Sequence, residues 1–323
     1  MSEALMLKCG EIVDVTAGSA RTGGEVVQCP DGRAGVFPVD VASGAVGELA
    51  TEGLFRLAKT ASVVLLQGQE VWWDHSANSA TYYGTNDKDF IIGTVHKDAA
   101  SAATTVDVFL NRRCRTIFDA AKDPGRSVLT RTAGLANLLH AGGSTSMKFS
   151  LDAEAQAGDL ISVRSWPIAS KWIFQAVVTV AVDADADVVD VSVGVADATH
   201  ASDADAIVTS AFFHLDLTGS NTNIYGESDN AAAEVAATDT TKDWVAATPF
   251  HVMIDGRSGD GSALAYYING VAVLTSTAFT VAGAAGPLKA LFLCEKTAND
   301  TPGTVCLDDM KVWLQDDAPA TAA

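Results

Sequence analysis

The stretch 35–74 contains short apolar runs separated by glycines at intervals of about ten residues. Val36 follows Gly35, Leu54 follows Gly53, and Val71 comes shortly after Gly68. Runs this short are typical of strands joined by tight turns, because glycine readily adopts the backbone conformations that such turns require. The pattern predicts a small β-barrel, and no catalytic group stands out in it.

Further apolar runs on either side of this stretch extend the expectation of strands to the whole chain. The N-terminal candidates cover residues 11–15, 25–29, 63–66, 90–95 and 105–110. From residue 147 the runs become longer and alternate between apolar and polar residues, at 172–182, 188–195, 211–217, 250–255, 263–274, 288–293 and 305–314. Many alternating strands with turn-rich connections predict an all-β chain whose second part is an antiparallel two-sheet sandwich.

Charge is unevenly distributed along the chain, whose formal net charge is −19. Residues 1–146 hold 13 Lys and Arg against 16 Asp and Glu, whereas residues 147–323 hold 8 against 24. Phosphate attraction needs the opposite sign, so the acidic second part argues against binding of nucleic acid. No run of about 18 apolar residues exists, and we therefore expect no membrane span.

The five cysteines form no pair with the spacing of a zinc site and leave an odd number, so reduced thiols are expected. The N-terminus has an early acidic residue and no long apolar segment, which argues against a secretory signal.

Several spaced elements in residues 10–111 carry a resemblance to a known family. In order they are GEIVDV, TGGEVVQ, AGVFPVDVASG, GELATEGLFRLAKT, QGQEVWWD and IIGTVHKDAASAATTVDVFLN. Together they resemble the small capsid decoration (cement) proteins of tailed bacteriophages. The resemblance implies a virion protein on the outer surface of the capsid, with the major capsid protein as partner and no enzymatic activity. Because a shell repeats symmetrically, we expect a homotrimer.

A basic segment follows the region of resemblance. Residues 111–131 hold six basic residues against two aspartates in an otherwise acidic protein. One interpretation is a solvated connector, and the other is an arm that docks on the capsid. The candidate capsid contacts are Arg112, Arg113, Arg115, Ile117, Phe118 and, from the barrel, Trp72. Residues 134–140 are expected to form a short helix, and Gly142 and Gly143 a hinge.

The end of the chain carries a second resemblance. A strand at 250–255, the hairpin sequence YYINGV at 266–271 and the sequence LDDMKVW at 307–313 resemble the concanavalin-A-like jelly rolls of lectin and laminin-G-type modules. Such modules often bind glycans, so aromatic residues are candidates for a sugar-stacking platform. These candidates are Tyr225, Trp244, Tyr266 and Tyr267. Packing in the core is the competing interpretation.

The expected organisation therefore has four parts. They are a capsid-binding β-barrel in 1–110, a basic linker or arm in 111–146, a jelly roll in 147–316 and a disordered tail in 317–323.

Asp183, Asp185 and Asp187 belong to the densest group of carboxylates and are weak candidates for a Ca²⁺ site. An EF-hand counted from Asp183 would need glycine at Val188 and glutamate at Gly194, so that motif fails. The favoured interpretation is a solvated tip between two strands, with no metal and no cofactor.

Motifs for catalysis are absent. Gly142 to Lys148 is the nearest approach to a phosphate-binding loop, and its lysine is misplaced. The carboxylates Glu227 and Asp229 are followed by a glutamate only at Glu234, which does not fit a jelly-roll glycosidase. We therefore expect a structural decoration protein that displays an outward jelly roll. The alternative is a carbohydrate-binding module that attaches to host or environmental glycans.

Overall fold

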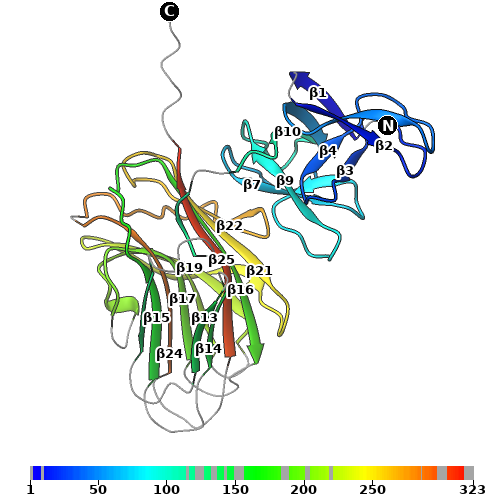
Figure 1. Cartoon of the computed structure of the whole chain (residues 1–323). Helices are drawn as coiled ribbons and strands as arrows, with labels where there is room; N and C mark the ends of the chain where they lie inside the picture. The colour runs from blue at the N-terminus through cyan, green and yellow to red at the C-terminus, as the bar shows by residue number, and fades with distance from the viewer. Residues whose placement is uncertain are drawn as a thin grey trace, which may run out of the picture. The chain divides into compact units, whose positions relative to one another are not determined.

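The computed structural model describes residues 3–8, 11–113, 116–120, 127–131, 137–141, 144–148, 156–182, 189–200, 204–217, 221–284, 286–296 and 304–315. The chain divides into two compact units, unit 1 at Met1–Arg115 and unit 2 at Thr116–Ala323 (Figure 1). Within the described residues both units are built from antiparallel strands, and the one helical element is the 3₁₀ turn η2 at Ala204–Ala206. No helix in this part of the chain is long and apolar enough to cross a membrane.

Unit 1 contains a six-stranded sheet with the order β1-β6-β10-β9-β7-β8. Its strands are β1 Ala4–Lys8, β6 Leu54–Ala58, β7 Glu70–Asp74, β8 Ser79–Thr81, β9 Phe90–Val95 and β10 Thr105–Leu110. Alternate residues of these strands, such as Phe55, Leu57, Val71 and Trp73, are fully buried in one apolar core. The expected strand at 63–66 is reduced to a single bridge between Leu65 and Ala99.

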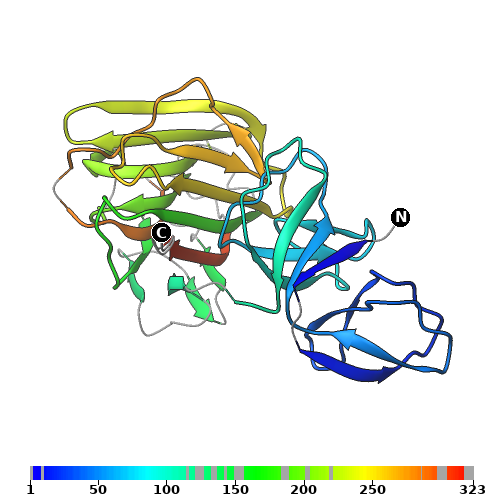
Figure 2. The same cartoon turned by 90° about the horizontal axis from the view of Figure 1, so that it is seen from above.

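A second sheet of unit 1 has the order β2-β5-β4-β3, and Figure 2 shows it as a separate small layer. Its strands are β2 Ile12–Thr16, β3 Val26–Gln28, β4 Ala34–Val36 and β5 Val46–Ala50. Strands β2 and β3 are its two end strands. The all-β expectation is confirmed, but among the described strands unit 1 consists of two open sheets rather than a closed barrel.

Unit 2 is a sandwich of two sheets, as the alternating pattern predicted (Figures 1 and 2). The seven-stranded sheet has the order β12-β15-β24-β17-β18-β19-β20. Its strands are β12 Ser127–Arg131, β15 Gln156–Ser162, β17 Val189–Ala196, β18 Thr209–Asp216, β19 Asn223–Asn230, β20 Glu234–Asp243 and β24 Lys289–Lys296.

The eight-stranded sheet has the order β13-β14-β25-β16-β21-β22-β23, with β11 also pairing with β25. Its strands are β11 Thr116–Asp119, β13 Asn137–Ala141, β14 Ser144–Lys148, β16 Trp172–Val182, β21 Phe250–Gly256, β22 Ala265–Ile268, β23 Val271–Val273 and β25 Thr304–Leu314. Alternate residues of both sheets, including Val193, Phe213, Phe174 and Ile254, meet in one buried core. This arrangement is consistent with the expected jelly roll.

The expectation of a linker at 111–146 is wrong. Strands β11, β13 and β14 join the eight-stranded sheet, and β12 pairs with β15 of the other sheet. The expected helix at 134–140 is also wrong, because β13 begins at Asn137 and pairs with β14. The boundary between the units therefore lies near residue 115 rather than 146. The predicted hinge glycines and the tail 317–323 lie outside the described residues.

Candidate functional site

The predicted capsid contacts do not form one surface. Phe118 lies on β11 and is completely buried in the core of unit 2, and the neighbouring Ile117 packs against the same core. The fully buried Phe118 stabilises the sandwich and cannot be a capsid contact, whereas the half-buried Ile117 stays a prediction. Trp72 is half-buried on β7, with its ring centroid 5.4 Å from that of Tyr83. Arg115 lies outside the described residues.

Arg112 and Arg113, in contrast, are exposed at the end of β10. The Arg112 guanidinium lies 5.0 Å from the centroid of the Phe109 ring, a cation–π distance. Arg113 Nη1 lies 3.6 Å from Oε1 of the buried Glu70. Together with Arg33 they line a hollow of about 260 Å³, which we call the arginine hollow. Sequence reasoning missed Arg33, which is far from the basic segment in the chain.

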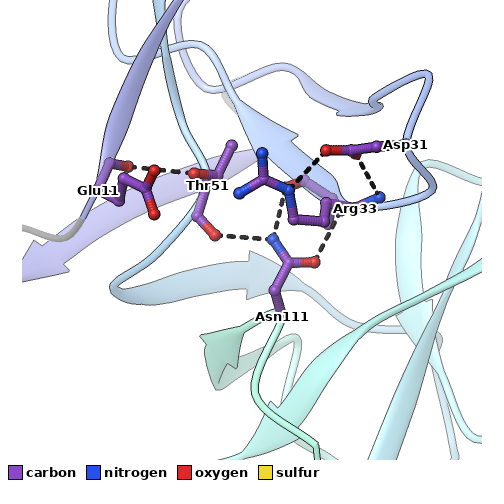
Figure 3. A network of polar contacts seen from close by, with 6 residues as sticks. Glu11, Asp31, Arg33, Thr51 and Asn111 are labelled. Carbon is purple, nitrogen blue, oxygen red and sulfur yellow. Dashed lines mark hydrogen bonds and ion pairs between the residues drawn. The ribbon is translucent and has the colours of Figure 1, made fainter.

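Asn111 fixes the geometry of the arginine hollow (Figure 3). Its side-chain Nδ2 donates hydrogen bonds to the carbonyls of Ala34 at 2.8 Å and Thr51 at 2.7 Å, and its Oδ1 accepts one from Ala34 N at 2.8 Å. Its φ of 55° is left-handed, a conformation that asparagine tolerates better than most residues. The side chain thereby ties the end of β10 to β4 and to the end of β5.

Arg33 is held in place by its neighbour Asp31. The Arg33 Nε donates to Asp31 Oδ2 at 2.8 Å, and the Arg33 backbone N donates to Oδ1 at 3.0 Å. These hydrogen bonds, first the backbone one and then the side-chain one, lower the pKa of the Asp31 carboxyl. Three arginines around one ionised aspartate leave the hollow with net positive charge.

A second, largely apolar hollow of about 460 Å³ lies between the two end strands of the small sheet. Val13 and Val15 of β2, Val27 of β3, Leu49 of β5 and Phe37 line it. Asp31 and Arg33 belong to the lining of both hollows, so the two hollows are adjacent. We call the combined surface the docking surface of unit 1. It offers an apolar groove with a basic end.

The predicted aromatic platform of unit 2 is not assembled. Tyr266 is only 1% exposed, and its hydroxyl donates a hydrogen bond to the Glu227 carbonyl at 2.7 Å. Trp244 is also buried in the sandwich core. The half-buried Tyr225 and Tyr267 lie on β19 and β22, strands of different sheets. Two of the four candidates are therefore core residues, and the other two do not form a shared platform.

A histidine–carboxylate cluster occupies the face of the seven-stranded sheet that is turned away from the core. It consists of Asp190 on β17, Asp205 on η2, His214 on β18 and Glu227 on β19. His214 Nδ1 lies 3.7 Å from Glu227 Oε1, and His214 Nε2 lies 3.7 Å from Asp190 Oδ1. This cluster was not predicted from the sequence, because its members come from four separate elements. The predicted metal candidates Asp183, Asp185 and Asp187 lie outside the described residues.

Electrostatics inside the cluster are strongly coupled. Burial alone would lower the pKa of His214, but the carboxylate of Glu227 and the charges of Asp190 and Asp205 raise it to about 9. Burial raises the pKa of Asp190 to about 6, although the charge of His214 opposes this. The imidazole is therefore surrounded by groups that favour a cation at its position.

The fold defines the class of the protein: an all-β chain with two open sheets in unit 1 and an acidic sandwich in unit 2. Residues 7–110 match the family model described as phage cement protein, which covers nearly all of unit 1. The match confirms the resemblance that the spaced sequence elements of this region carry. No curated protein matches the chain.

Solved structures similar to the chain include carbohydrate-binding domains. The carbohydrate recognition domain of Emp46p in its potassium-bound form is 9% identical, with a TM-score of 0.42 over 61% of this chain and 92% of that one. The carbohydrate binding module CBM66 from Bacillus subtilis is 11% identical, with a TM-score of 0.34 over 57% and 94%. A carbohydrate esterase of the Shiga toxin-encoding bacteriophage phi24B is 12% identical, with a TM-score of 0.41 over 62% and 99%.

Proposed function

We propose that the protein is a structural capsid decoration protein that binds the outer surface of a phage head through unit 1 and displays unit 2. The observation that carries this proposal is the coincidence of the cement-family match, residues 7–110, with a separately folded unit. The proposed role needs no catalysis and no cofactor. Its partner is the major capsid protein.

The docking surface of unit 1 supports the proposal with a chemically defined contact. The valines, Phe37 and Leu49 of the groove leave apolar area that binding would remove from water. The arginines at its end favour carboxylates on the partner. We propose that this surface binds an extended segment of the capsid protein that contains apolar and acidic residues. Apolar residues complement the groove, and acidic residues complement the arginine hollow.

Shell stabilisation follows from added interface between capsid subunits. An interface of standard size, about 1,600 Å² in total, strengthens a shell because internal pressure must break these contacts as well, although area alone does not fix affinity. The repetition of the shell favours a trimer at local three-fold positions.

Co-sedimentation of the purified full chain with undecorated capsids tests the proposal. We expect Val15→Glu in the groove and Arg112→Glu in the arginine hollow each to weaken binding at least tenfold, by placing a charge in the groove or reversing one at its end. Val46→Glu on β5 and Arg164→Glu in unit 2 are matched controls, because both side chains are exposed and line neither hollow. Absence of the wild-type chain from the capsid pellet would exclude the function. Equal binding of capsids by all four variants would exclude this surface as the capsid-binding site.

A glycan-binding role for unit 2 is a second candidate. Its supporting observation is the half-buried Tyr225, whose hydroxyl accepts hydrogen bonds from Asn221 Nδ2 and Asn223 Nδ2, each at 3.2 Å. Amides around an aromatic ring are groups that can bind sugar hydroxyls. A glycan array probed with the full chain and with Tyr225→Ala tests this role. If the full chain binds no glycan on the array, the glycan-binding role is excluded.

A further inference from the structure

We propose that Asp205, His214 and Glu227 bind one divalent transition-metal ion on the outer face of the seven-stranded sheet, and that Asp190 orients the histidine. Each of the three side chains can supply one ligand atom, and these atoms lie within 4.8 Å of one another. Ligand atoms around a tetrahedral zinc ion are separated by about 3.3–3.6 Å, given metal–ligand distances near 2.1 Å. Small side-chain rotations therefore suffice to bring the three atoms to one ion.

The elements that carry the three ligands are fixed by packing. His214 and Glu227 lie on the paired strands β18 and β19, where His214 is opposite Tyr225 and Phe212 is opposite Glu227. Asp205 lies on η2, which is held to the sheet because Ala204 and Ile207 on either side are buried with Phe212 and Leu291. The site thus has two ligands on a rigid sheet and one on an anchored turn.

Glu227 provides a separate observation that points to a ligand. Its side chain is only 10% exposed, and its buried Oε1 has no hydrogen-bond partner among the described residues. The nearest charged group of opposite sign is His214 Nδ1 at 3.7 Å, which is beyond hydrogen-bond distance. Ser192 Oγ lies 3.4 Å from the same Nδ1, so a metal ion shared by Glu227 Oε1 and His214 Nδ1 would replace this contact and give the buried carboxylate oxygen a partner.

The other side of the imidazole faces a carboxylate that a small side-chain rotation would bring within hydrogen-bond distance. Histidine ligands almost always donate their second ring N–H to a carboxylate or carbonyl, which orients the ring. With Nδ1 toward Glu227, Nε2 faces Asp190 Oδ1 at 3.7 Å. Asp190 comes from β17, the strand next to β18, where Ser192 is opposite His214 and Asp190 lies diagonally across from the imidazole.

The ligand chemistry favours a transition metal over calcium or magnesium. One imidazole nitrogen with two carboxylates suits Zn²⁺ or Mn²⁺, whereas calcium and magnesium prefer oxygen ligands alone. Asp205 is exposed, so an ion can enter from solvent and keep water on its open side.

Isothermal titration of the EDTA-treated full chain with Zn²⁺ tests the proposal. We expect one site per chain, binding of Zn²⁺ at least tenfold tighter than that of Ca²⁺ or Mg²⁺, and a rise in the thermal midpoint with Zn²⁺ concentration. Asp205→Asn and Glu227→Gln keep the shape of the side chains and should each weaken Zn²⁺ binding by tenfold or more. Asp190→Asn should weaken it about 10- to 100-fold without changing the stoichiometry.

Controls separate this site from other zinc ligands and from misfolding. His75→Gln removes an exposed histidine of unit 1 and should bind Zn²⁺ like the wild type. The near-ultraviolet spectrum of the Co²⁺-loaded chain should lack the charge-transfer band of thiolate ligands, which excludes cysteine as a ligand. Circular dichroism of each variant in EDTA should match the wild type. Unchanged Zn²⁺ affinity in Asp205→Asn and Glu227→Gln, or no Zn²⁺ bound by the wild type, overturns the proposal.

Discussion

At the scale of single residues, Asn111 combines two features that are separable by experiment: a left-handed backbone and three side-chain hydrogen bonds. We expect Asn111→Ala to destabilise unit 1 by about 2–4 kcal/mol, because buried groups of Ala34 and Thr51 lose their partners. Asn78→Ala is a matched control, since Asn78 has a φ of 50° but is exposed and its side chain has no hydrogen bond to any described residue. Urea unfolding measures the stability of both variants. An equal loss of unfolding free energy in Asn111→Ala and Asn78→Ala would contradict the stabilising role of the Asn111 hydrogen bonds.

His251 gives a pH-dependent prediction, because burial and then the charge of Lys311 lower its pKa from 6.5 to about 3. Its neutral form is favoured in the folded state, so its contribution to stability is complete above about pH 6.5 and is lost as the pH falls toward 3. Relative to His251→Leu, the wild type should lose about 1 kcal/mol of unfolding free energy per pH unit between pH 6 and 4. Parallel stability curves of the two proteins would contradict this.

For single residues, the sequence did not show which side chains face the core and which face solvent. The pair Tyr266 and Tyr267 indicates a strand, but only the register of β22 on β21 shows which ring faces the core. Tyr266 lies inside and Tyr267 outside, and the aromatic platform fails for this reason. His214 did carry a usable signal, because it alternates with the buried Phe213 and Leu215 and must face outward.

At the scale of elements, β11 to β14 are among the strands that the sequence did not reveal, together with β15, β19 and β20. Basic residues between two apolar regions indicated a solvated linker, yet a strand at the edge of a sheet tolerates charged side chains. Strand β12 lies at one end of the seven-stranded sheet, and β13 lies at one end of the eight-stranded sheet. The long central strands β16 and β21, in contrast, were predicted because nearly continuous apolar runs have few other interpretations.

These strands determine which fragment of the chain can fold. A fragment of residues 116–323 should unfold cooperatively and show near-ultraviolet circular dichroism, because it retains both sheets and Phe118. A fragment of residues 147–323 should aggregate, since it lacks β11–β13 and most of β14, exposes an edge of β25, and loses the burial of Phe118, worth about 3–5 kcal/mol. A soluble, cooperative 147–323 fragment would show that β11–β14 are dispensable.

At the scale of the whole molecule, the two units differ in charge. Unit 2 holds 26 Asp and Glu against 11 Lys and Arg, and unit 1 holds 14 against 10. Copies of unit 2 crowded on one shell would repel each other over a Debye length of about 30 Å at 0.01 M salt and 10 Å at 0.1 M. We therefore expect the saturating number of copies per capsid to rise between these salt concentrations.

Quantitative gel analysis of decorated particles measures that number. Neutralising exposed carboxylates of unit 2, for example by Asp239→Asn and Asp243→Asn, provides the control and should reduce the salt effect. A constant or falling number of copies with rising salt would show that repulsion between unit 2 copies does not limit occupancy.

The position of Asn111 has a mechanical consequence. The chain leaves unit 1 shortly after this residue, so any drag on unit 2 enters unit 1 at the end of β10. There the Asn111 side chain is hydrogen-bonded to the backbones of residues 34 and 51, so part of the force would pass to two other segments of unit 1. The same hydrogen bonds that order the arginine hollow would therefore resist a pulling force that separates β10 from its sheet.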